Sequence, residues 1–424
     1  MKVIVNKAVL GGTVKAISSK SHAHRILIGA ALSDTATTVT CEETSDDIMA
    51  TINCLKGMGA KITDTANGYK VEPIDREKLL DEVQIDCNES GSTLRFILPI
   101  VSALFNKTSI DMRGRLSKRP IEPLRTELIK NGATIGEEGS VPLIVNGKIS
   151  SGNYVIPGNI SSQYISGLLF ALPLLDGDST ITITDELESK SYIDMTIDVI
   201  RMFEINIEWE GNVIKIPGNQ EYKSPSEITV EGDWSNMAFW LAAGAFNDEE
   251  MSCGNLNFYS VQGDKHILEI LKEMGTNIIY DSNNSLILQH SGLEGITIDV
   301  KNIPDLVPVI AVLASVAKGK TTIVNAKRLR MKESDRIESV VNTLKAIGAD
   351  IEATEDGMVI NGVESLKGGK VDSCNDHRIV MMAAIAALVS EESVVITNAE
   401  AVNKSYRTFF EDYKKLGGIV KYSD

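Results

Sequence analysis

The hydrophobic and polar positions of this chain follow a pattern that returns six times. Each time a short polar segment opens a run that is apolar on all sides, and a second, amphipathic run follows and ends at a turn before a β-branched strand. A helix that is apolar all round lies in a protein core. In the second run at residues 337–347, apolar side chains recur at steps of three and four, which is typical of a helix with one buried stripe. The pattern predicts six buried helices, each followed by a helix with a solvent-exposed face.

The turns that end the second runs fall at positions 59, 132, 204, 275, 348 and 417, which are separated by 73, 72, 71, 73 and 69 residues. Glycine, the usual left-handed end of a helix, occupies five of these positions. Glu204 occupies the third, so we expect that helix to end by another device. Units of about 70 residues are longer than common solenoid repeats and have the size of a small helix-and-sheet domain. In a chain of 424 residues, six such units divide most simply as three and three.

Four arginines stand in the first turns of predicted helices: Arg25, Arg95, Arg336 and Arg378. A cation is unfavourable at this positive end of the helix dipole unless an anion lies nearby. Free backbone N–H groups together with arginine form a strong receptor for phosphate or carboxylate. One such arginine is as well explained by a salt bridge, but the set of four favours an anion-binding site.

Two further polar segments could complete such a site. Ser161, Ser162 and Gln163 offer two hydroxyls and an amide at another helix start, although a motif of this kind by itself is more often an ordinary N-cap. The segment at residues 113–119 carries four cations around Gly114, and we expect it to be a loop. Charge runs of this kind are usually solvated, but a glycine-hinged loop could also close on an anion.

Carboxylates beside these cations suggest proton transfer. Lys332 and Glu333 precede a helix whose N-cap we expect to be Ser334, and together they could clamp an anion and donate a proton. Asp305 follows Pro304 at the start of an apolar helix. It could cap that helix or accept a hydroxyl proton from a ligand, and the sequence leaves both interpretations open.

Composition excludes several classes of function. A net charge of −16 argues against nucleic acid or anionic membranes as partners. The longest apolar stretches fall short of the roughly 20 residues of a membrane helix, and the N-terminus lacks the features of a secretory signal, so we expect a cytoplasmic protein. The five cysteines and five histidines show no zinc-type spacing, so we expect no metal. Walker, Rossmann and nucleophile-elbow motifs are missing from the sequence.

Six motifs, in order along nearly the whole chain, resemble those of the 5-enolpyruvylshikimate-3-phosphate synthase (EPSP synthase) family of enolpyruvyl transferases. They are Lys20-Ser21 with Arg25, Asn88 with Gly91-Ser92 and Arg95, Arg115 with Arg119-Pro120, Ser161-Ser162-Gln163, Lys332-Glu333-Ser334-Asp335-Arg336, and Asp376-His377-Arg378. The resemblance implies an α/β (α+β) fold, a two-domain inverse α/β barrel-like architecture of six βαβαββ repeats with three per domain. It implies an N-terminal lobe at residues 14–230, on the side of shikimate 3-phosphate. A discontinuous C-terminal lobe would comprise residues 1–13 and 231–424.

The resemblance also implies a reaction. The enolpyruvyl group of phosphoenolpyruvate would be transferred to the 5-hydroxyl of shikimate 3-phosphate by addition and elimination, releasing phosphate, in the shikimate pathway to chorismate and aromatic amino acids. These two small molecules would be the partners, with no cofactor, and we expect a monomer. The implied catalytic residues are Lys20, Asp305 and Glu333.

Residues that match the family's motifs are expected to bind the substrates. Those for shikimate 3-phosphate are Lys20, Ser21, Arg25, Ser161, Ser162, Gln163, Ser189, Tyr192, Asp305 and Lys332. Those for phosphoenolpyruvate are Lys20, Gly91, Arg115, Gln163, Arg336, Arg378 and Lys404.

Two alternative functions remain. UDP-N-acetylglucosamine enolpyruvyl transferase shares the implied architecture and chemistry, but it normally carries a cysteine in the loop equivalent to residues 111–121, where this chain has none. A noncatalytic protein that binds phosphorylated ligands could use the same arginines. Asp305 and Glu333 argue against it, because anion binding alone would not favour carboxylates beside the cations.

Overall fold

One sheet topology is repeated throughout the chain. A computed structural model describes residues 1–246, 249–281, 285–289 and 292–423, and within them the strands form six four-stranded sheets. In each sheet one edge strand is parallel to its neighbour, and the remaining neighbours are antiparallel. Parallel neighbours require a crossover, and in four of the six sheets a buried helix that lies between the two strands in the chain supplies it.

The chain divides into two compact units, which we call the continuous unit (Lys20–Val230) and the discontinuous unit (Met1–Ser19 with Glu231–Asp424). Each unit contains three of the sheets. The predicted fold class, six βαβαββ repeats with three per unit, is confirmed.

The continuous unit has the sheet orders β14-β3-β5-β4, β6-β7-β9-β8 and β10-β11-β13-β12. Its strands are β3 (Thr37–Thr40), β4 (Lys61–Thr65), β5 (Gly68–Glu72), β6 (Glu82–Asp86), β7 (Lys107–Asp111), β8 (Thr134–Ile135), β9 (Leu143–Asn146), β10 (Asn153–Pro157), β11 (Ser179–Thr184), β12 (Glu208–Glu210), β13 (Val213–Ile216) and β14 (Glu227–Thr229). Residues of β11 alternate between buried and half-buried, as expected for strands with one face on the core.

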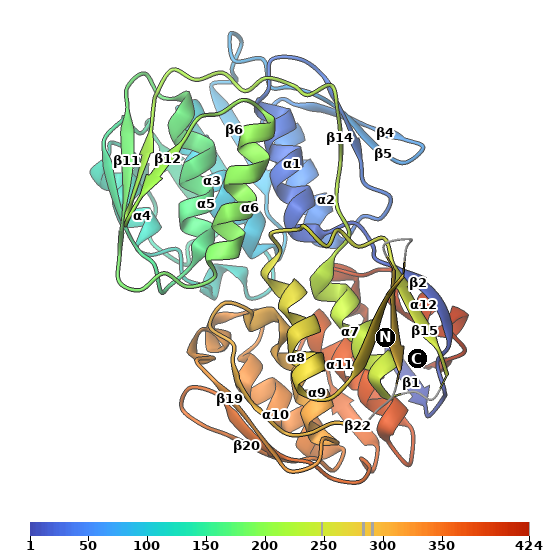
Figure 1. The fold of residues 1–424 in the computed structure, drawn as a ribbon. Helices are drawn as coiled ribbons and strands as arrows, with labels where there is room; N and C mark the ends of the chain where they lie inside the picture. Colours follow the sequence, from blue (N-terminus) through green and yellow to red (C-terminus); the bar gives the residue numbers. More distant parts are fainter. Residues whose placement is uncertain (247–248, 282–284, 290–291, 424) are drawn as a thin grey trace. The chain divides into compact units, whose positions relative to one another are not determined.

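The discontinuous unit has the sheet orders β16-β17-β15-β2, β18-β19-β21-β20 and β22-β23-β1-β24. Its strands are β1 (Lys2–Asn6), β2 (Gly12–Lys15), β15 (Met251–Gly254), β16 (Asn277–Asp281), β17 (Ser285–Gln289), β18 (Thr297–Asp299), β19 (Lys320–Val324), β20 (Asp350–Ala353), β21 (Met358–Asn361), β22 (Gly369–Asp372), β23 (Val394–Thr397) and β24 (Ile419–Ser423). Strand β1 lies between β23 and β24, so both ends of the chain belong to one sheet (Figure 1).

The first strands of two repeats are exchanged where the chain crosses between the units. Strand β2 precedes the first helix of the continuous unit but pairs with β15. Strand β14 precedes the first long helix of the discontinuous unit but pairs with β3. Since β2 holds the chain in the discontinuous unit as far as Ser19, the first crossing lies six residues beyond the position expected from the resemblance.

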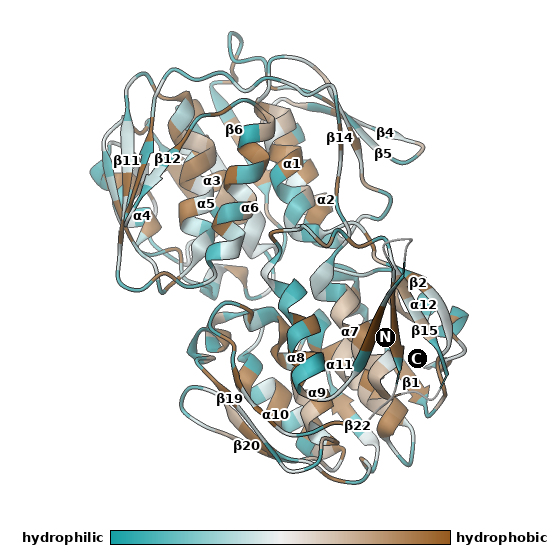
Figure 2. Ribbon diagram, in the orientation of Figure 1, coloured by the Kyte–Doolittle hydropathy of each residue, from teal (hydrophilic) through white to brown (hydrophobic). Residues whose placement is uncertain are grey.

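Six central helices follow the first strands. They are α1 (Lys20–Leu32), α3 (Gly91–Leu104) and α5 (Ser162–Ala171) in the continuous unit, and α7 (Trp234–Phe246), α9 (Val307–Ser315) and α11 (His377–Ala386) in the other. Nearly all of their residues are buried, which confirms the prediction from the apolar runs. Figure 2 shows hydrophobic residues along helices such as α3 and α11. Among the described helices, none combines the length and apolar character needed to span a bilayer.

Amphipathic helices cover the outside of each unit, as the second runs predict. They are α2 (Asp46–Gly57), α4 (Leu124–Lys130), α6 (Lys190–Met202), α8 (Ile267–Glu273), α10 (Arg336–Ala346) and α12 (Phe409–Lys415). Short 3-10 turns complete the chain at η1 (Leu116–Lys118), η2 (Leu172–Leu174), η3 (Gly263–His266), η4 (Pro304–Leu306), η5 (Lys327–Met331), η6 (Ala387–Val389) and η7 (Ala399–Lys404).

The expectation that Glu204 ends its helix by another device is wrong. Glu204 has a φ of 63° and takes the same left-handed conformation as the five glycines at the equivalent positions. Its backbone N–H donates to the carbonyl of Arg201 at 3.0 Å, which closes the helix end. The turn geometry is therefore retained even where glycine is replaced, at the expense of backbone strain.

Candidate active site

Side-chain hydrogen bonds connect the starts of α3 and α5 in the continuous unit. Gln163 donates through Nε2 to Ser92 Oγ at 2.8 Å and accepts through Oε1 from Arg95 at 2.8 Å. Arg95 also donates to the carbonyl of Pro120 at 2.9 Å. Arg95 therefore orients Gln163 and the segment before α4, and this differs from the anion-binding role expected from its helix position.

A chain of buried hydroxyls connects α1, α2 and the start of α3. His24 Nδ1 lies 2.7 Å from Thr51 Oγ1, which lies 2.7 Å from Thr93 Oγ1. Thr93 in turn donates to Ser90, the N-cap of α3, at 2.8 Å. Burial, then the charges of Lys20 and Arg25, hold the pKa of His24 well below its usual value, so this histidine is neutral. It is a packing residue within this buried chain of hydroxyls.

Arg25 is a buried cation whose hydrogen bonds end on neutral oxygens. It donates to Thr196 Oγ1 at 2.7 Å, to the carbonyl of Ser21 at 2.7 Å and to the carbonyl of Tyr192 at 3.0 Å. Its guanidinium also lies 4.9 Å from the centre of the Phe96 ring. Burial lowers its pKa to about 9. Burial has removed this cation from water, and the hydroxyl and carbonyls that it contacts do not neutralise its charge. An incoming anion would therefore be bound favourably.

Lys20, the first residue of α1, forms an ion pair with Asp47 at 2.8 Å, and both side chains are largely buried. Asp47 is not among the site residues predicted from the sequence. The only sequence signal is the acidic pair Asp46-Asp47 in the first turn of α2, which helix-dipole rules explain without any functional role. The ion pair holds the Lys20 ammonium at the same end of the unit as Arg25 and Gln163.

Other predicted residues lie at these helix starts. Ser161 caps α5 by accepting the N–H of Gln163, and Ser162 is buried beside it. Ser189 is buried, has a left-handed φ of 55° and immediately precedes α6. Tyr192 follows in the first turn of α6, where its carbonyl holds Arg25.

Gly91 allows a close approach of an arginine. A Cβ at this position would stand 2.5 Å from Nη1 of Arg119, so only glycine permits the guanidinium to lie against the start of α3. Arg115, in contrast, is exposed on the segment before η1. The structure thus confirms the predicted loop but does not bring Arg115 into the buried network.

In the discontinuous unit the side chain of Arg336 gathers three carboxylates, although it is only 1% exposed. It donates to Asp305 at 2.6 Å, to Glu333 at 2.6 Å and to Asp376 at 2.8 Å. Burial opposes its charge, but Asp376, Glu333 and Asp305 outweigh burial and raise its pKa well above the usual value. We call Asp305, Lys332, Glu333, Arg336, Asp376 and Arg378 the arginine cluster.

Asp305 lies among three cations of this cluster. Besides Arg336, its carboxylate approaches Arg378 at 3.3 Å and Lys332 at 3.6 Å, and its carbonyl accepts from Arg378 at 3.0 Å. Burial alone would raise the pKa of Asp305, but Arg378, Lys332 and Arg336 hold it well below its usual value. Burial lowers the pKa of Lys332 to about 8. The carboxylate is occupied by cations, so it does not serve as a simple helix cap.

The expected N-cap of α10 is wrong by one residue. Asp335 caps the helix and accepts the N–H of Glu338 at 3.2 Å. The hydroxyl of Ser334 donates to Asp376 at 3.1 Å, so it is directed into the arginine cluster and away from the helix end. Lys404, at the end of η7, donates to the carbonyl of Asn375 at 2.8 Å and so lies near the start of α11.

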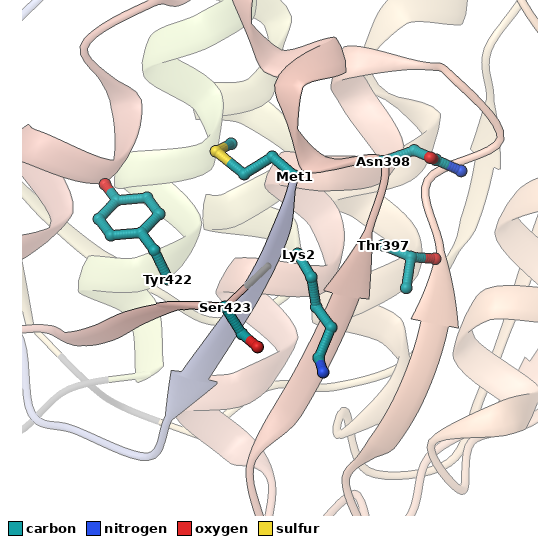
Figure 3. A pocket seen from close by; sticks show the side chains of 6 residues that line it. All are labelled: Met1, Lys2, Thr397, Asn398, Tyr422 and Ser423. Carbon is teal, nitrogen blue, oxygen red and sulfur yellow. The ribbon is translucent and has the colours of Figure 1, made fainter.

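Two hollows within the discontinuous unit lie apart from these clusters. The first, of about 840 Å³, is at the ends of β1, β23 and β24 (Figure 3) and is lined by Met1, Lys2, Thr397, Asn398, Tyr422 and Ser423. The second, of about 740 Å³, is lined by residues that include Lys7, Phe246, Lys318 and Val389. Neither contains a predicted site residue. In the described part of the chain, no group of three or more His, Cys, Asp or Glu residues is placed to hold a metal ion.

The two units therefore each gather predicted residues at the starts of central and outer helices. In the continuous unit these are hydroxyls, an amide, a lysine and a buried arginine, which suit phosphate and carboxylate oxygens. In the discontinuous unit, cations and ionisable carboxylates share one cluster, which suits proton transfer beside an anion.

Comparisons with known proteins point to one family over nearly the whole chain. A family model described as EPSP synthase (3-phosphoshikimate 1-carboxyvinyltransferase) matches residues 5–413. The 3-phosphoshikimate 1-carboxyvinyltransferase of Clostridium acetobutylicum is 46% identical and covers 99% of this chain and 98% of its own length. That of Clostridium perfringens is 44% identical and covers 99% of both. The solved structure of EPSP synthase from Acinetobacter baumannii has a TM-score of 0.84 at 26% identity and covers 100% of both chains.

Proposed function

The chain belongs to the EPSP synthase family, and we infer that it is a transferase that moves the enolpyruvyl group of phosphoenolpyruvate to the 5-hydroxyl of shikimate 3-phosphate and releases phosphate. This reaction belongs to the shikimate pathway, which leads to chorismate and the aromatic amino acids. The observation that carries the conclusion is the match of one family over nearly the whole chain.

We propose that the helix starts of the continuous unit hold most of shikimate 3-phosphate. The proposed contacts are Lys20, Ser21, Arg25, Ser161, Ser162, Gln163, Ser189 and Tyr192, with Asp305 and Lys332 from the discontinuous unit. The burial of Arg25 among neutral acceptors supports this assignment, because a phosphate would supply the missing negative charge.

For phosphoenolpyruvate we propose Lys20, Gly91, Arg115, Gln163, Arg336, Arg378 and Lys404. Arg336 and Arg378 support the proposal because both guanidinium groups are already held by carboxylates in fixed orientations. Gly91 would admit a ligand close to the backbone N–H groups at the start of α3.

The proposed chemistry is addition followed by elimination, with Asp305 as the base for the 5-hydroxyl. The low pKa of Asp305 keeps it ionised, yet it also makes the carboxylate a weak base. Anionic substrates would also pair with Lys332, Arg336 and Arg378, so these cations would stabilise the Asp305 carboxylate less. The pKa of Asp305 would then rise in the substrate complex, where Asp305 must accept a proton. Lys20 and Glu333 are the proposed proton donors to the enolpyruvyl carbon or the departing phosphate.

One assay tests this function. Phosphate release from phosphoenolpyruvate is measured with shikimate 3-phosphate, with UDP-N-acetylglucosamine and without an acceptor. We expect release with shikimate 3-phosphate alone. Release only with the sugar nucleotide would identify the other enolpyruvyl transferase, and no release with either would favour a noncatalytic binding protein.

We further propose that the protein acts in the cytoplasm as a monomer. Its net charge of −16 and its small anionic substrates support the absence of nucleic acid and membrane partners. Light scattering on the eluting peak of a size-exclusion column would give the mass directly. We expect the 46.0 kDa of a single chain.

A further inference from the structure

Asp264, in η3, is a buried carboxylate that the proposed reaction has not used. Asp264 is only 2% exposed. One of its carboxylate oxygens, Oδ2, accepts a hydrogen bond from the hydroxyl of Ser235 in the first turn of α7. In the part of the chain that the structure describes, the other oxygen, Oδ1, is buried with no hydrogen-bond partner. An unpartnered oxygen on a buried acid is costly, so it calls for a physical explanation.

The surroundings of Asp264 connect it to the arginine cluster. Helix α7 packs against both η3 and η4, and η4 carries Asp305. The charged groups that act on Asp264 are Asp305, Arg378 and Asp233. On its own turn, the Lys265 ammonium is directed away, since it donates to the carbonyls of Phe258 and Ser260. Asp264 and Asp305 therefore both interact electrostatically with Arg378.

The two carboxylates differ in their ion pairs. Asp305 is within 4 Å of Arg336, Arg378 and Lys332, whereas the side chain of Asp264 accepts its hydrogen bond from a neutral hydroxyl. When two like charges share a buried site, the one with fewer cationic partners is protonated first. A protonated carboxyl carries no net charge, so an Oδ1 without a hydrogen-bond partner costs less than it would on a carboxylate.

We propose that Asp264 is a positioning acid for Asp305: it takes the proton of the carboxylate pair and, by sharing Arg378, sets how strongly Asp305 binds a proton. The role rests on the proposed enolpyruvyl transfer, in which Asp305 accepts the hydroxyl proton. Burial, then Asp305, raises the pKa of Asp264 to about 6, which agrees with this division of roles.

The test uses the full chain with Asp264→Asn, which keeps the shape of the side chain but cannot ionise. Turnover is measured from pH 5 to pH 8.5. We expect the wild-type profile to show an inflection near pH 6 that the variant lacks. Without the negative charge of Asp264, Asp305 loses proton affinity, so turnover at pH 7 falls about three- to tenfold. The KM values for both substrates stay within about twofold.

Ser235→Ala provides a matched variant, because it removes the hydroxyl that donates to Asp264 but leaves both carboxylates in place. Loss of that hydrogen bond disfavours the ionised form, so the inflection moves to higher pH. An inflection that persists unchanged in Asp264→Asn would overturn the proposal. A change in KM alone would do the same, since it would reduce Asp264 to a structural residue.

The pH dependence of thermal stability tests the protonation of Asp264 without any measurement of enzyme activity. The folded-state pKa of Asp264 lies above its unfolded value, so its contribution to stability is full at low pH and is lost as pH rises through about 6. The Tm of Asp264→Asn should therefore rise relative to wild type between pH 4.5 and pH 7.5. A constant difference would contradict the proposal even if the wild type failed to turn over shikimate 3-phosphate, so failure of the proposed function remains distinguishable.

Discussion

Arg25 and Arg336 carry the same guanidinium group in opposite surroundings. Three carboxylates surround Arg336 and raise its pKa, whereas Arg25 is held by a hydroxyl and two carbonyls, and burial lowers its pKa. A charge balanced within the protein adds rigidity, and an unbalanced one favours an anionic ligand. The surroundings, more than the residue type, therefore distinguish Arg336, whose guanidinium is held in a fixed orientation by carboxylates, from Arg25, whose charge is left to an incoming anion.

Arg25→Met should separate binding from stability. Methionine keeps an unbranched side chain but removes the charged guanidinium that lies over the Phe96 ring. We expect affinity for shikimate 3-phosphate to fall about 10- to 150-fold, as for the loss of charged hydrogen bonds. The Tm should stay equal or rise, because a desolvated cation has been removed. Calorimetric titration and thermal unfolding measure both quantities. Arg201→Met, at an exposed position of α6, should change neither.

Asp305→Asn should reduce turnover far more than binding. Removing a general base typically costs about 10²- to 10⁴-fold in rate, so we expect kcat to fall at least about 100-fold. The dissociation constant of shikimate 3-phosphate should change by less than about tenfold. Exposed Asp350 offers a control, since Asp350→Asn should leave kcat intact. Unchanged turnover with a comparable loss of affinity would remove the catalytic role of Asp305.

Glu204→Gly should stabilise the protein. A residue other than glycine in the left-handed conformation costs roughly 1–2 kcal/mol, and glycine loses about 0.5–1 kcal/mol of that gain to chain entropy. We expect the free energy of unfolding in urea to rise by about 0.5–1 kcal/mol. Gly132→Ala should act in the opposite direction, because Gly132 has a φ of 117° and a Cβ there would stand 2.9 Å from the Lys148 carbonyl. A less stable Glu204→Gly variant would refute the strain argument.

At the scale of elements, each site cluster depends on hydrogen bonds between helix starts. In the continuous unit the chain from His24 through Thr51 and Thr93 to Ser90 connects α1, α2 and α3, while Gln163 connects α3 and α5. These hydrogen bonds are buried, so removal of one partner leaves the other with no hydrogen bond to protein or water. The geometry of the helix starts is therefore fixed before any ligand arrives.

Thr51→Val should weaken this connection without changing side-chain volume. The substitution leaves His24 Nδ1 and Thr93 without their shared partner, which should destabilise the protein by about 1–3 kcal/mol. We also expect a higher KM for shikimate 3-phosphate, because Lys20 and Arg25 lie on the helix that loses its anchor. Thermal unfolding and steady-state kinetics provide the measurements. Thr63→Val, on the exposed side of β4, is the control, and equal behaviour of the two variants would disprove the connection.

At the scale of the whole molecule, the chain path makes the two units unequal. All strands of the continuous unit lie within residues 37–229, so its three sheets are complete in one segment. The discontinuous unit takes β1 and β2 from the N-terminus, and β1 lies between β23 and β24. Without residues 1–19, one sheet loses an edge strand and another is divided.

Separate fragments should show this inequality. We expect residues 20–230 to unfold cooperatively by themselves in circular dichroism. Residues 231–424 should lack a cooperative transition until a peptide of residues 1–19 is added, because only the peptide restores β1 and β2. A peptide with the same composition in scrambled order is the control. Cooperative folding of residues 231–424 alone would contradict the role assigned to the N-terminal strands.

Local chemistry determined much of this protein from the sequence itself. The recurring turns at Gly59, Gly132, Gly275 and Gly348 predicted the repeat, because a left-handed helix end is a local requirement that glycine meets. Apolar periodicity predicted the buried and outer helices, because burial of a helix depends on its own side chains. Family resemblance in the motifs then supplied the expected reaction and candidate residues.

Tertiary structure alone decided which side chains meet. The pairing of Lys20 with Asp47, the hydrogen bond from Arg95 to Gln163 and the hydrogen bond from Ser235 to Asp264 join residues from separate elements. The exchange of β2 and β14 between the units was equally hidden, since a strand's own sequence does not identify its partner. Periodicity and capping are set by neighbours along the chain, whereas ion pairs and strand partners are set by neighbours in space.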